Sequence, residues 1–90
     1  MAGALKVEGA VTMWSAARQL AEGRERLHAG DLVVDFSGVS EADSAALGVL
    51  LDWCRVARTA GHALTIRGLP TGLRSLADLY GISELLPVEA

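Results

Sequence analysis

The residues best placed for chemistry lie in the stretch EADSAALGVLLDW at positions 41–53. Ser44 carries a lone hydroxyl just after the carboxylates of Glu41 and Asp43, and it opens an uncharged run that ends at Leu51. A serine at the head of a helix can cap it by accepting a hydrogen bond from a free backbone N–H. It can also carry a phosphate, because a helix N-terminus stabilises negative charge. Both roles stay open for Ser44.

The helix that this stretch begins is apolar around most of its circumference. At about 100° per residue the apolar arc covers roughly 240°, whereas a helix packed on a sheet needs little more than about 100°. The remaining polar strip holds Ser44, Gly48 and Asp52. One apolar flank should face a sheet, and the other is covered either by neighbouring helices or by a partner. We expect Ala46, Val49 and Trp53 to help form a protein-binding surface.

Other chemistries lack their characteristic residues. The stretch GLPTGLRS has glycines without the GK[ST] of a phosphate-binding loop. His28 and His62 adjoin glycines or helix ends, where a cation or a turn residue is a better interpretation than a metal ligand. Cys54 falls on the apolar side of its helix and has no candidate base nearby in the sequence, so we expect a small core residue. No catalytic residue, metal or cofactor is predicted.

Two further pairs of residues have alternative interpretations. Glu41 and Asp43 are better explained as a solvated loop than as a weak cation site. Trp14 and Tyr80 are expected to be partly buried packing residues, and Tyr80 can alternatively belong to a partner surface.

Length and composition indicate one domain spanning residues 1–90. Hydrophobic residues make up 51% and the net charge is −3, with acids and bases interspersed, so no basic stripe suggests nucleic-acid binding. Lys6 and Glu8 interrupt the N-terminal segment, which does not resemble a signal peptide, and no uncharged run approaches the roughly 20 residues of a membrane span. We expect a cytoplasmic protein whose apolar excess is covered by a partner.

Apolar periodicity indicates alternating strands and helices. The strands are expected at 4–8, 31–38 and 62–68, and the helices at about 13–28, 44–59 and 69–81. Gly9, Gly30 and Gly61 end their elements, and Thr12 is the expected N-cap of the first helix. Because strand and helix alternate, we predict an α/β fold with parallel strands joined by right-handed crossovers.

The stretch VVDFSGVSEADSAALGVLLDW resembles the signature of STAS domains, whose best-known members are the anti-sigma-factor antagonists. That signature is an apolar strand, a short loop and D-S/T-x-G-L at the head of an apolar helix. Asp43 and Ser44 match the Asp and the phosphorylatable Ser/Thr, and Leu47 matches the Leu, whereas Ala46 replaces the glycine. The resemblance implies a small, mostly parallel sheet with three to four helices.

The similarity is closer to the MlaB-type STAS proteins of the Mla phospholipid-transport system. It covers nearly the whole chain, from ALKVEG through the stretch above to LRSLADLYGISELLP. It implies a non-enzymatic subunit that binds the ATPase of the Mla ABC transporter at the inner face of the inner membrane, through the helix beginning at Ser44. The expected contact residues are Glu41, Asp43, Ser44, Ala46, Leu47, Gly48, Val49, Asp52, Trp53 and Tyr80.

The alternative is an anti-sigma-factor antagonist that binds an anti-sigma factor kinase and is switched by phosphorylation of Ser44. Ala46 and the Leu-Tyr-Gly segment favour the transport branch. STAS domains usually have an extra first strand, and only Met1 to Gly3 precede ALKVEG here. The gene start can be misplaced, the chain shortened or the strand truly absent. Its absence would expose a sheet edge and favour a homodimer.

Overall fold

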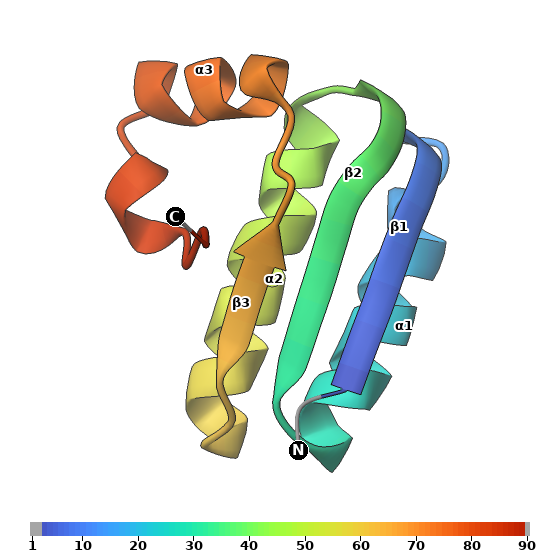
Figure 1. The fold of residues 1–90 in the computed structure, drawn as a ribbon, viewed down its shortest axis with the longest axis vertical. Helices are drawn as coiled ribbons and strands as arrows, with labels where there is room; N and C mark the ends of the chain where they lie inside the picture. The colour runs from blue at the N-terminus through green and yellow to red at the C-terminus, as the bar shows by residue number, and fades with distance from the viewer. Residues whose placement is uncertain (1–2, 90) are drawn as a thin grey trace.

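The computed structural model describes residues 3–89, in which strands and helices alternate in the predicted order (Figure 1). The elements are β1 (Gly3–Val11), α1 (Ala16–Ala29), β2 (Leu32–Ala42), α2 (Ser44–Ala60), β3 (Leu64–Arg67), α3 (Thr71–Leu79) and the 3-10 helix η1 (Ser83–Leu85). The strands form a parallel sheet in the order β1-β2-β3. The predicted α/β fold class is therefore confirmed.

Both crossover helices, α1 and α2, lie on the same face of the sheet (Figure 1). Two right-handed crossovers that progress in the same direction along a sheet must place their helices on one side. The opposite face carries alternate residues of each strand. In register across that face are Lys6, Asp35 and Arg67, one from each strand. Their alternating charge suits a face that the described residues leave uncovered by a helix.

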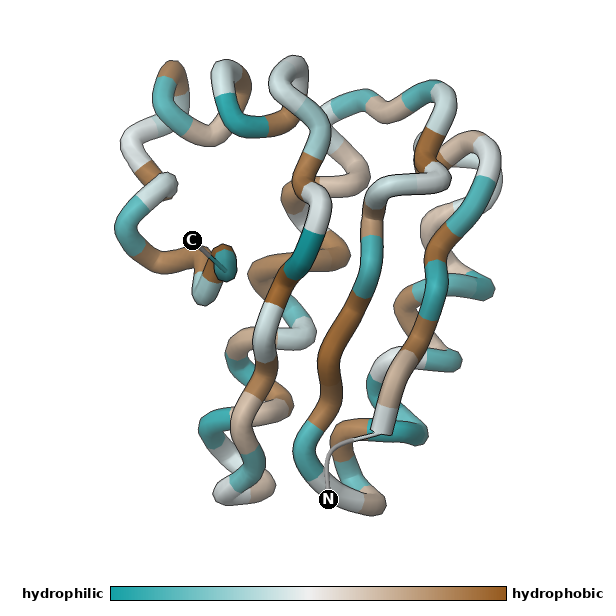
Figure 2. The backbone as a smooth tube through the Cα atoms, viewed as in Figure 1, coloured by the Kyte–Doolittle hydropathy of each residue, from teal (hydrophilic) through white to brown (hydrophobic). Residues whose placement is uncertain are grey.

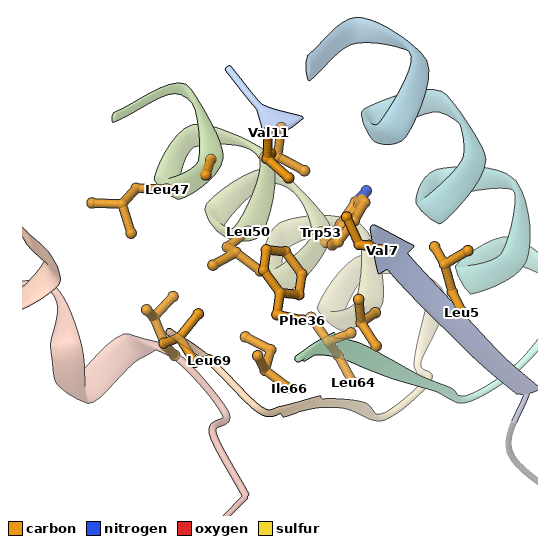
Figure 3. Close-up of a cluster of buried hydrophobic side chains, with 14 of the residues drawn as sticks. Leu5, Val7, Val11, Phe36, Leu47, Leu50, Trp53, Leu64, Ile66 and Leu69 are labelled. Atoms are coloured by element: carbon orange, nitrogen blue, oxygen red, sulfur yellow. The ribbon is translucent and has the colours of Figure 1, made fainter. Parts of the chain in front are cut away.

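The core fills the layer between the sheet and the two helices (Figure 3). Hydropathy alternates along β1, whereas β2 has a continuous apolar stretch, as befits the central strand (Figure 2). The ring of Phe36 on β2 meets that of Trp53 on α2 edge to face, with centroids 6.4 Å apart and planes at 77°. Both rings are completely buried, so they lie at the centre of the core.

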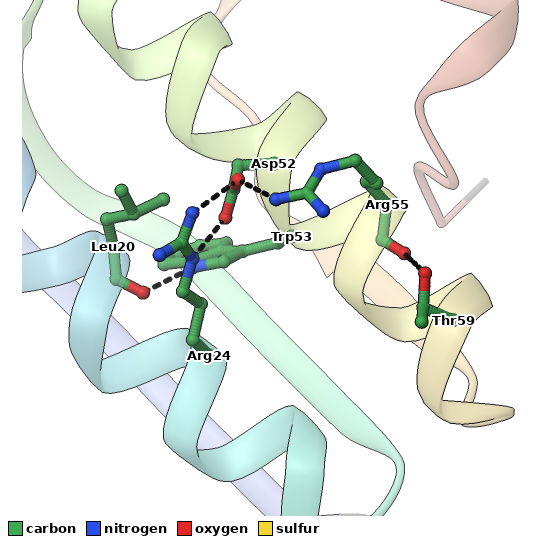
Figure 4. A network of polar contacts seen from close by, with 6 residues as sticks. All are labelled: Leu20, Arg24, Asp52, Trp53, Arg55 and Thr59. Atoms are coloured by element: carbon green, nitrogen blue, oxygen red, sulfur yellow. Dashed lines mark hydrogen bonds and ion pairs between the residues drawn. The ribbon is translucent and has the colours of Figure 1, made fainter.

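Helix α1 packs directly on α2 around Trp53 (Figure 4). A Cβ atom on Gly23 would lie 2.2 Å from Cε2 of Trp53, so only glycine leaves room for the indole. The indole Nε1 donates a hydrogen bond of 3.1 Å to the carbonyl of Leu20. This contact satisfies the one polar group of a side chain that is otherwise surrounded by apolar atoms.

The close contact between the helices corrects the expected binding surface. The exposed fraction is 0% for Ala46 and Trp53, 3% for Leu47 and 4% for Val49. The prediction that these four side chains contact a partner is therefore wrong, because the chain's own core covers them. The alternative, that the second flank is covered within the chain, agrees with the burial of Val49 and Val56, which are 4% and 6% exposed.

Several element boundaries differ from the predicted ones for one reason, the long ladder between β1 and β2. Glu8 to Val11 pair with the second half of β2, through two register shifts, so β1 continues past Gly9 and β2 continues to Ala42. Helix α1 then begins only at Ala16, and Thr12 is not its N-cap.

Two other elements, which this ladder does not involve, also differ from the prediction. Strand β3 and helix α3 are each shorter than expected.

Candidate protein-binding surface

The head of α2 is capped by Asp43. Its Oδ1 accepts a hydrogen bond of 2.8 Å from the N–H of Ala45, which satisfies one of the free donors of the first turn. The N-cap interpretation of Ser44 is therefore wrong, and this serine is the exposed first residue of the helix. Its hydroxyl is not needed to begin the helix, which leaves it free for a role outside the fold.

Open space surrounds the next residue along the same strip of α2. Gly48 is exposed, and a Cβ atom built on it would meet nothing within 4 Å. Residues four apart on a helix are neighbours on its surface. Ser44 and Gly48 thus present a small, uncrowded patch to solvent.

The loop between β1 and α1 lies beside this patch. The N–H of Met13 donates to Oδ2 of Asp43 at 3.4 Å, and the N–H of Asp43 donates to the carbonyl of Val11 at 3.3 Å. Met13 and Trp14 are 69% and 86% exposed. Two large apolar side chains therefore stand on a loop that is held against the head of α2, and such neighbouring exposed apolar residues are typical of an interaction site.

The sequence did not predict these two residues as part of a surface, because Met13 fell within the helix expected at about 13–28 and Trp14 was expected to be a partly buried packing residue. The structure shows instead a turn in which the N–H groups of Ser15 and Ala16 both donate to the carbonyl of Thr12. A second hydroxyl residue, Ser15, stands directly before the observed helix. Reading Ser15 as the N-cap position would have placed Met13 and Trp14 outside the helix.

A shallow groove borders the head of α2 on the side of α3. Its walls are the end of β2, Val39 to Ala42, and the first turns of α3, including Gly72 and Leu76. Glu41 is exposed and lines this groove. Tyr80 is 57% exposed, so it is not a packing residue, but it lies at the opposite end of α3 from the groove.

Asp52, another predicted contact residue, takes part in an ion-pair network within the chain (Figure 4). Its carboxylate takes two hydrogen bonds, of 2.6 and 2.7 Å, from the guanidinium of Arg24 on α1, and one of 2.8 Å from Arg55. The hydrogen bonds from Arg24 dominate over partial burial and, with those of Arg55, lower the pKa of Asp52 to about 2. This ion pair ties α1 to α2, so Asp52 is already engaged within the chain.

We call the surface at this end of the molecule the α2-head surface. It consists of the exposed residues Met13, Trp14, Glu41, Ser44 and Gly48, together with the half-buried capping residue Asp43. Apolar side chains, carboxylates and one hydroxyl suit protein recognition rather than bond-making chemistry. Burial raises the pKa of the Cys54 thiol, which favours its unreactive protonated form.

Residues 3–89 hold no group of three or more His, Cys, Asp or Glu side chains arranged to bind a metal ion. Over the same range, each helix is too short or too polar to cross a bilayer.

The family model for the Mlab STAS domain matches residues 1–87. The chain therefore belongs to the STAS family, in its MlaB-type branch, as the resemblance predicted. Members of this family are generally non-enzymatic regulatory proteins that mediate protein–protein interactions. No curated protein matches the chain at a significant level.

Solved structures share the fold. The unphosphorylated anti-sigma factor antagonist SpoIIAA is 12% identical, with a TM-score of 0.75 over 97% of this chain and 78% of its own. A candidate anti-sigma factor antagonist from Thermotoga maritima is 15% identical, with a TM-score of 0.81 over 94% of this chain and 75% of its own. At such low identity these similarities establish the STAS fold alone.

Proposed function

We propose that this chain is a non-enzymatic subunit that binds the ATPase of an Mla-type phospholipid-transport ABC transporter through the α2-head surface. The MlaB-type family match over residues 1–87 supports this class of partner. The observation that carries the choice of surface is the exposure of Trp14 and Met13 beside the free first turn of α2. In this proposal the chain works at the cytoplasmic face of the inner membrane, where its transporter holds it.

The α2-head surface has the make-up expected of an interface centre. Tryptophan is among the residues that most often dominate binding energy, because its large ring loses much water contact when a partner covers it. Trp14 and Met13 supply the apolar area, while Glu41 and Ser44 supply polar contacts around it. None of these side chains is needed in the core, so the chain can bind a partner without rearranging.

The test is binding of the full chain to the ATPase subunit of an Mla-type transporter from the same organism, measured by isothermal titration calorimetry. Trp14→Ala should weaken binding at least about tenfold, since it removes the largest exposed apolar contact. Leu85→Ala is the matched control, because Leu85 is also a large apolar residue, 63% exposed, but lies in η1 away from the α2 head. Equal affinities of the two variants would refute the surface, and no binding by the wild type would refute the partner.

A second candidate function, an antagonist of an anti-sigma factor switched by phosphorylation, is favoured by one observation. Ser44 is exposed at the first position of α2, where a kinase can reach it and the helix terminus tolerates a phosphate. Asp43 and Glu41 would then repel the added charge, which makes the phosphate disruptive at an interface.

Incubation with the candidate anti-sigma factor kinase and ATP tests this second function. Mass spectrometry should find a phosphate on Ser44 in the wild type and none in Ser44→Ala. Absence of the modification in the wild type, together with binding to the ATPase, would leave the transporter subunit as the only one of the two functions supported.

A further inference from the structure

The carboxylate of Asp43 contacts two different segments of the chain. Its Oδ1 accepts from the N–H of Ala45 in α2 at 2.8 Å, and its Oδ2 accepts from the N–H of Met13 in the turn before α1 at 3.4 Å. The backbone N–H of Asp43 donates to the carbonyl of Val11 at 3.3 Å, where β1 ends and this turn begins. Asp43 therefore joins the first turn of α2 to the segment that carries Met13 and Trp14.

The turn before α1 is held in shape by its own residues. The N–H of Thr12 donates to Oγ of Ser15 at 3.1 Å, and the N–H of Trp14 donates to Oγ1 of Thr12 at 3.4 Å. These hydrogen bonds shape the turn but do not reach α2. Within the part of the chain that the structure describes, the hydrogen bond from Met13 to Asp43 is the one that joins this turn to α2.

The side chain of Trp14 is not itself fixed by packing, because 86% of it is exposed. Its place beside the head of α2 follows from the position of the turn that carries it. A binding loop that is free to move must be ordered when the partner binds, and the entropy lost in this step lowers the affinity. A contact that holds the turn in the free chain avoids part of that loss.

We propose that Asp43 is a positioning residue, which holds the turn of Met13 and Trp14 against the head of α2 so that both segments meet the partner as one surface. This inference rests on the function proposed above and adds how its surface is assembled. Asp43 acts through Trp14 and not by touching the partner. It is half-buried, and both of its carboxylate oxygens accept from N–H groups of this chain.

Asparagine at this position separates the two roles of the carboxylate. Asp and Asn are about equally good N-caps, so Asp43→Asn can still accept from the N–H of Ala45. The Asn side chain has one carbonyl oxygen, and its second polar atom is an amide nitrogen that donates. It therefore cannot accept from Met13 at the same time. Asp43→Ala removes both acceptors and serves as the reference for a lost cap.

Amide hydrogen exchange of the free chain, measured by NMR, tests the contact itself. Asp43→Asn should speed exchange at Met13 at least about threefold and leave exchange at Ala45 close to that of the wild type. Asp43→Ala should speed exchange at both amides and lower the midpoint of urea unfolding, whereas Asp43→Asn should keep that midpoint. Unchanged exchange at Met13 in Asp43→Asn would overturn the proposal.

Calorimetric titration with the ATPase subunit tests the consequence for binding. Asp43→Asn should weaken binding about threefold, because the turn must then be ordered by the partner. Glu84→Gln is the matched control and should bind like the wild type, since it removes the same charge at an exposed position in η1, outside the α2-head surface.

A double-mutant cycle with Trp14→Ala distinguishes positioning from direct contact. If Asp43 acts through Trp14, adding Asp43→Asn to Trp14→Ala should cause little further loss of affinity, measured at protein concentrations about tenfold higher. A full threefold loss in that background would show that Asp43 contacts the partner itself, and it would overturn the proposal. Failure of the wild type to bind would refute the partner proposed above, whereas the exchange at Met13 would still decide whether Asp43 holds the turn.

Discussion

The chain has two tryptophans, and the regions around them contrast sharply. Trp53 is completely buried between α1 and α2, with its indole nitrogen bonded to Leu20, whereas Trp14 is 86% exposed on the loop beside the head of α2. Around Trp53 the neighbouring residues fit so closely that Gly23 has no room for a methyl group. Around Trp14 the loop is held by hydrogen bonds of its backbone with the hydroxyls of Thr12 and Ser15 and the carboxylate of Asp43. One region therefore stabilises the domain, and the other remains available to a partner.

The largest expected effect is the loss of the buried ring. Trp53→Ala should lower the free energy of unfolding by about 3–5 kcal/mol, because it removes apolar contacts and leaves a cavity in the core. Urea unfolding followed by circular dichroism measures the change. A loss below about 1 kcal/mol would mean that Trp53 is not the packing centre that its burial indicates.

The next largest effect on stability is expected from disturbing the packing of α1 against the Trp53 ring. Gly23→Ala should destabilise the domain by about 1–3 kcal/mol, since its Cβ would overlap Trp53 and force the helices apart. Gly48→Ala is the matched control, because it is also within a helix but faces open space. It should stabilise the domain by roughly 0.5–1 kcal/mol through helix propensity. Equal responses of the two variants would contradict the contact between Gly23 and Trp53.

The ion pair beside Trp53 predicts a smaller, pH-dependent effect. The pKa of Asp52 is lowered from 3.8 to about 2 by Arg24 and Arg55, so its contribution is present above pH 4 and is lost as the pH falls toward 2. After solvent screening we expect about 1 kcal/mol. The difference in unfolding free energy between wild type and Asp52→Asn should therefore shrink between pH 6 and pH 2.5. A difference independent of pH would show that the carboxylate charge does not stabilise the contact.

The smallest effect on stability is expected at the other tryptophan. Trp14→Ala should change the free energy of unfolding by no more than about 0.5 kcal/mol, because the side chain makes little contact with the fold. The same urea titration measures it. A loss approaching that of Trp53→Ala would show that Trp14 is part of the core, and the contrast between the two regions would disappear.

The sequence predicted the order of elements and the parallel sheet because local signals specify them. Gly30 and Gly61 end their helices where expected, and Gly61 adopts the left-handed conformation that its C-cap position requires. The length of β1 and β2 was underestimated. Their second halves pair with each other through shifted register, and that pairing is a tertiary interaction that overrides the turn signal of Gly9.

The candidate site was predicted only in part, for a related reason. Asp43 and Ser44 at the head of α2 were recognisable from the family signature. Helical periodicity could show that α2 has more apolar surface than one sheet covers, but not whether α1 or a partner covers the remainder. The close contact between Gly23 of α1 and Trp53 of α2 shows that α1 covers it, but these two residues are thirty positions apart in the sequence. Trp14, the most exposed large apolar residue described, carried no local sign of its exposure.

The central claim is that the free head of α2 binds the partner while the rest of the helix belongs to the core. Its most direct test compares Ser44→Asp with Thr59→Asp for affinity to the ATPase. Both replace an exposed hydroxyl residue on α2 with the same charge, about 22 Å apart along the helix. Ser44→Asp should bind at least about tenfold more weakly than the wild type, whereas Thr59→Asp should bind nearly as well as the wild type. Equal affinity of Ser44→Asp and the wild type would contradict it.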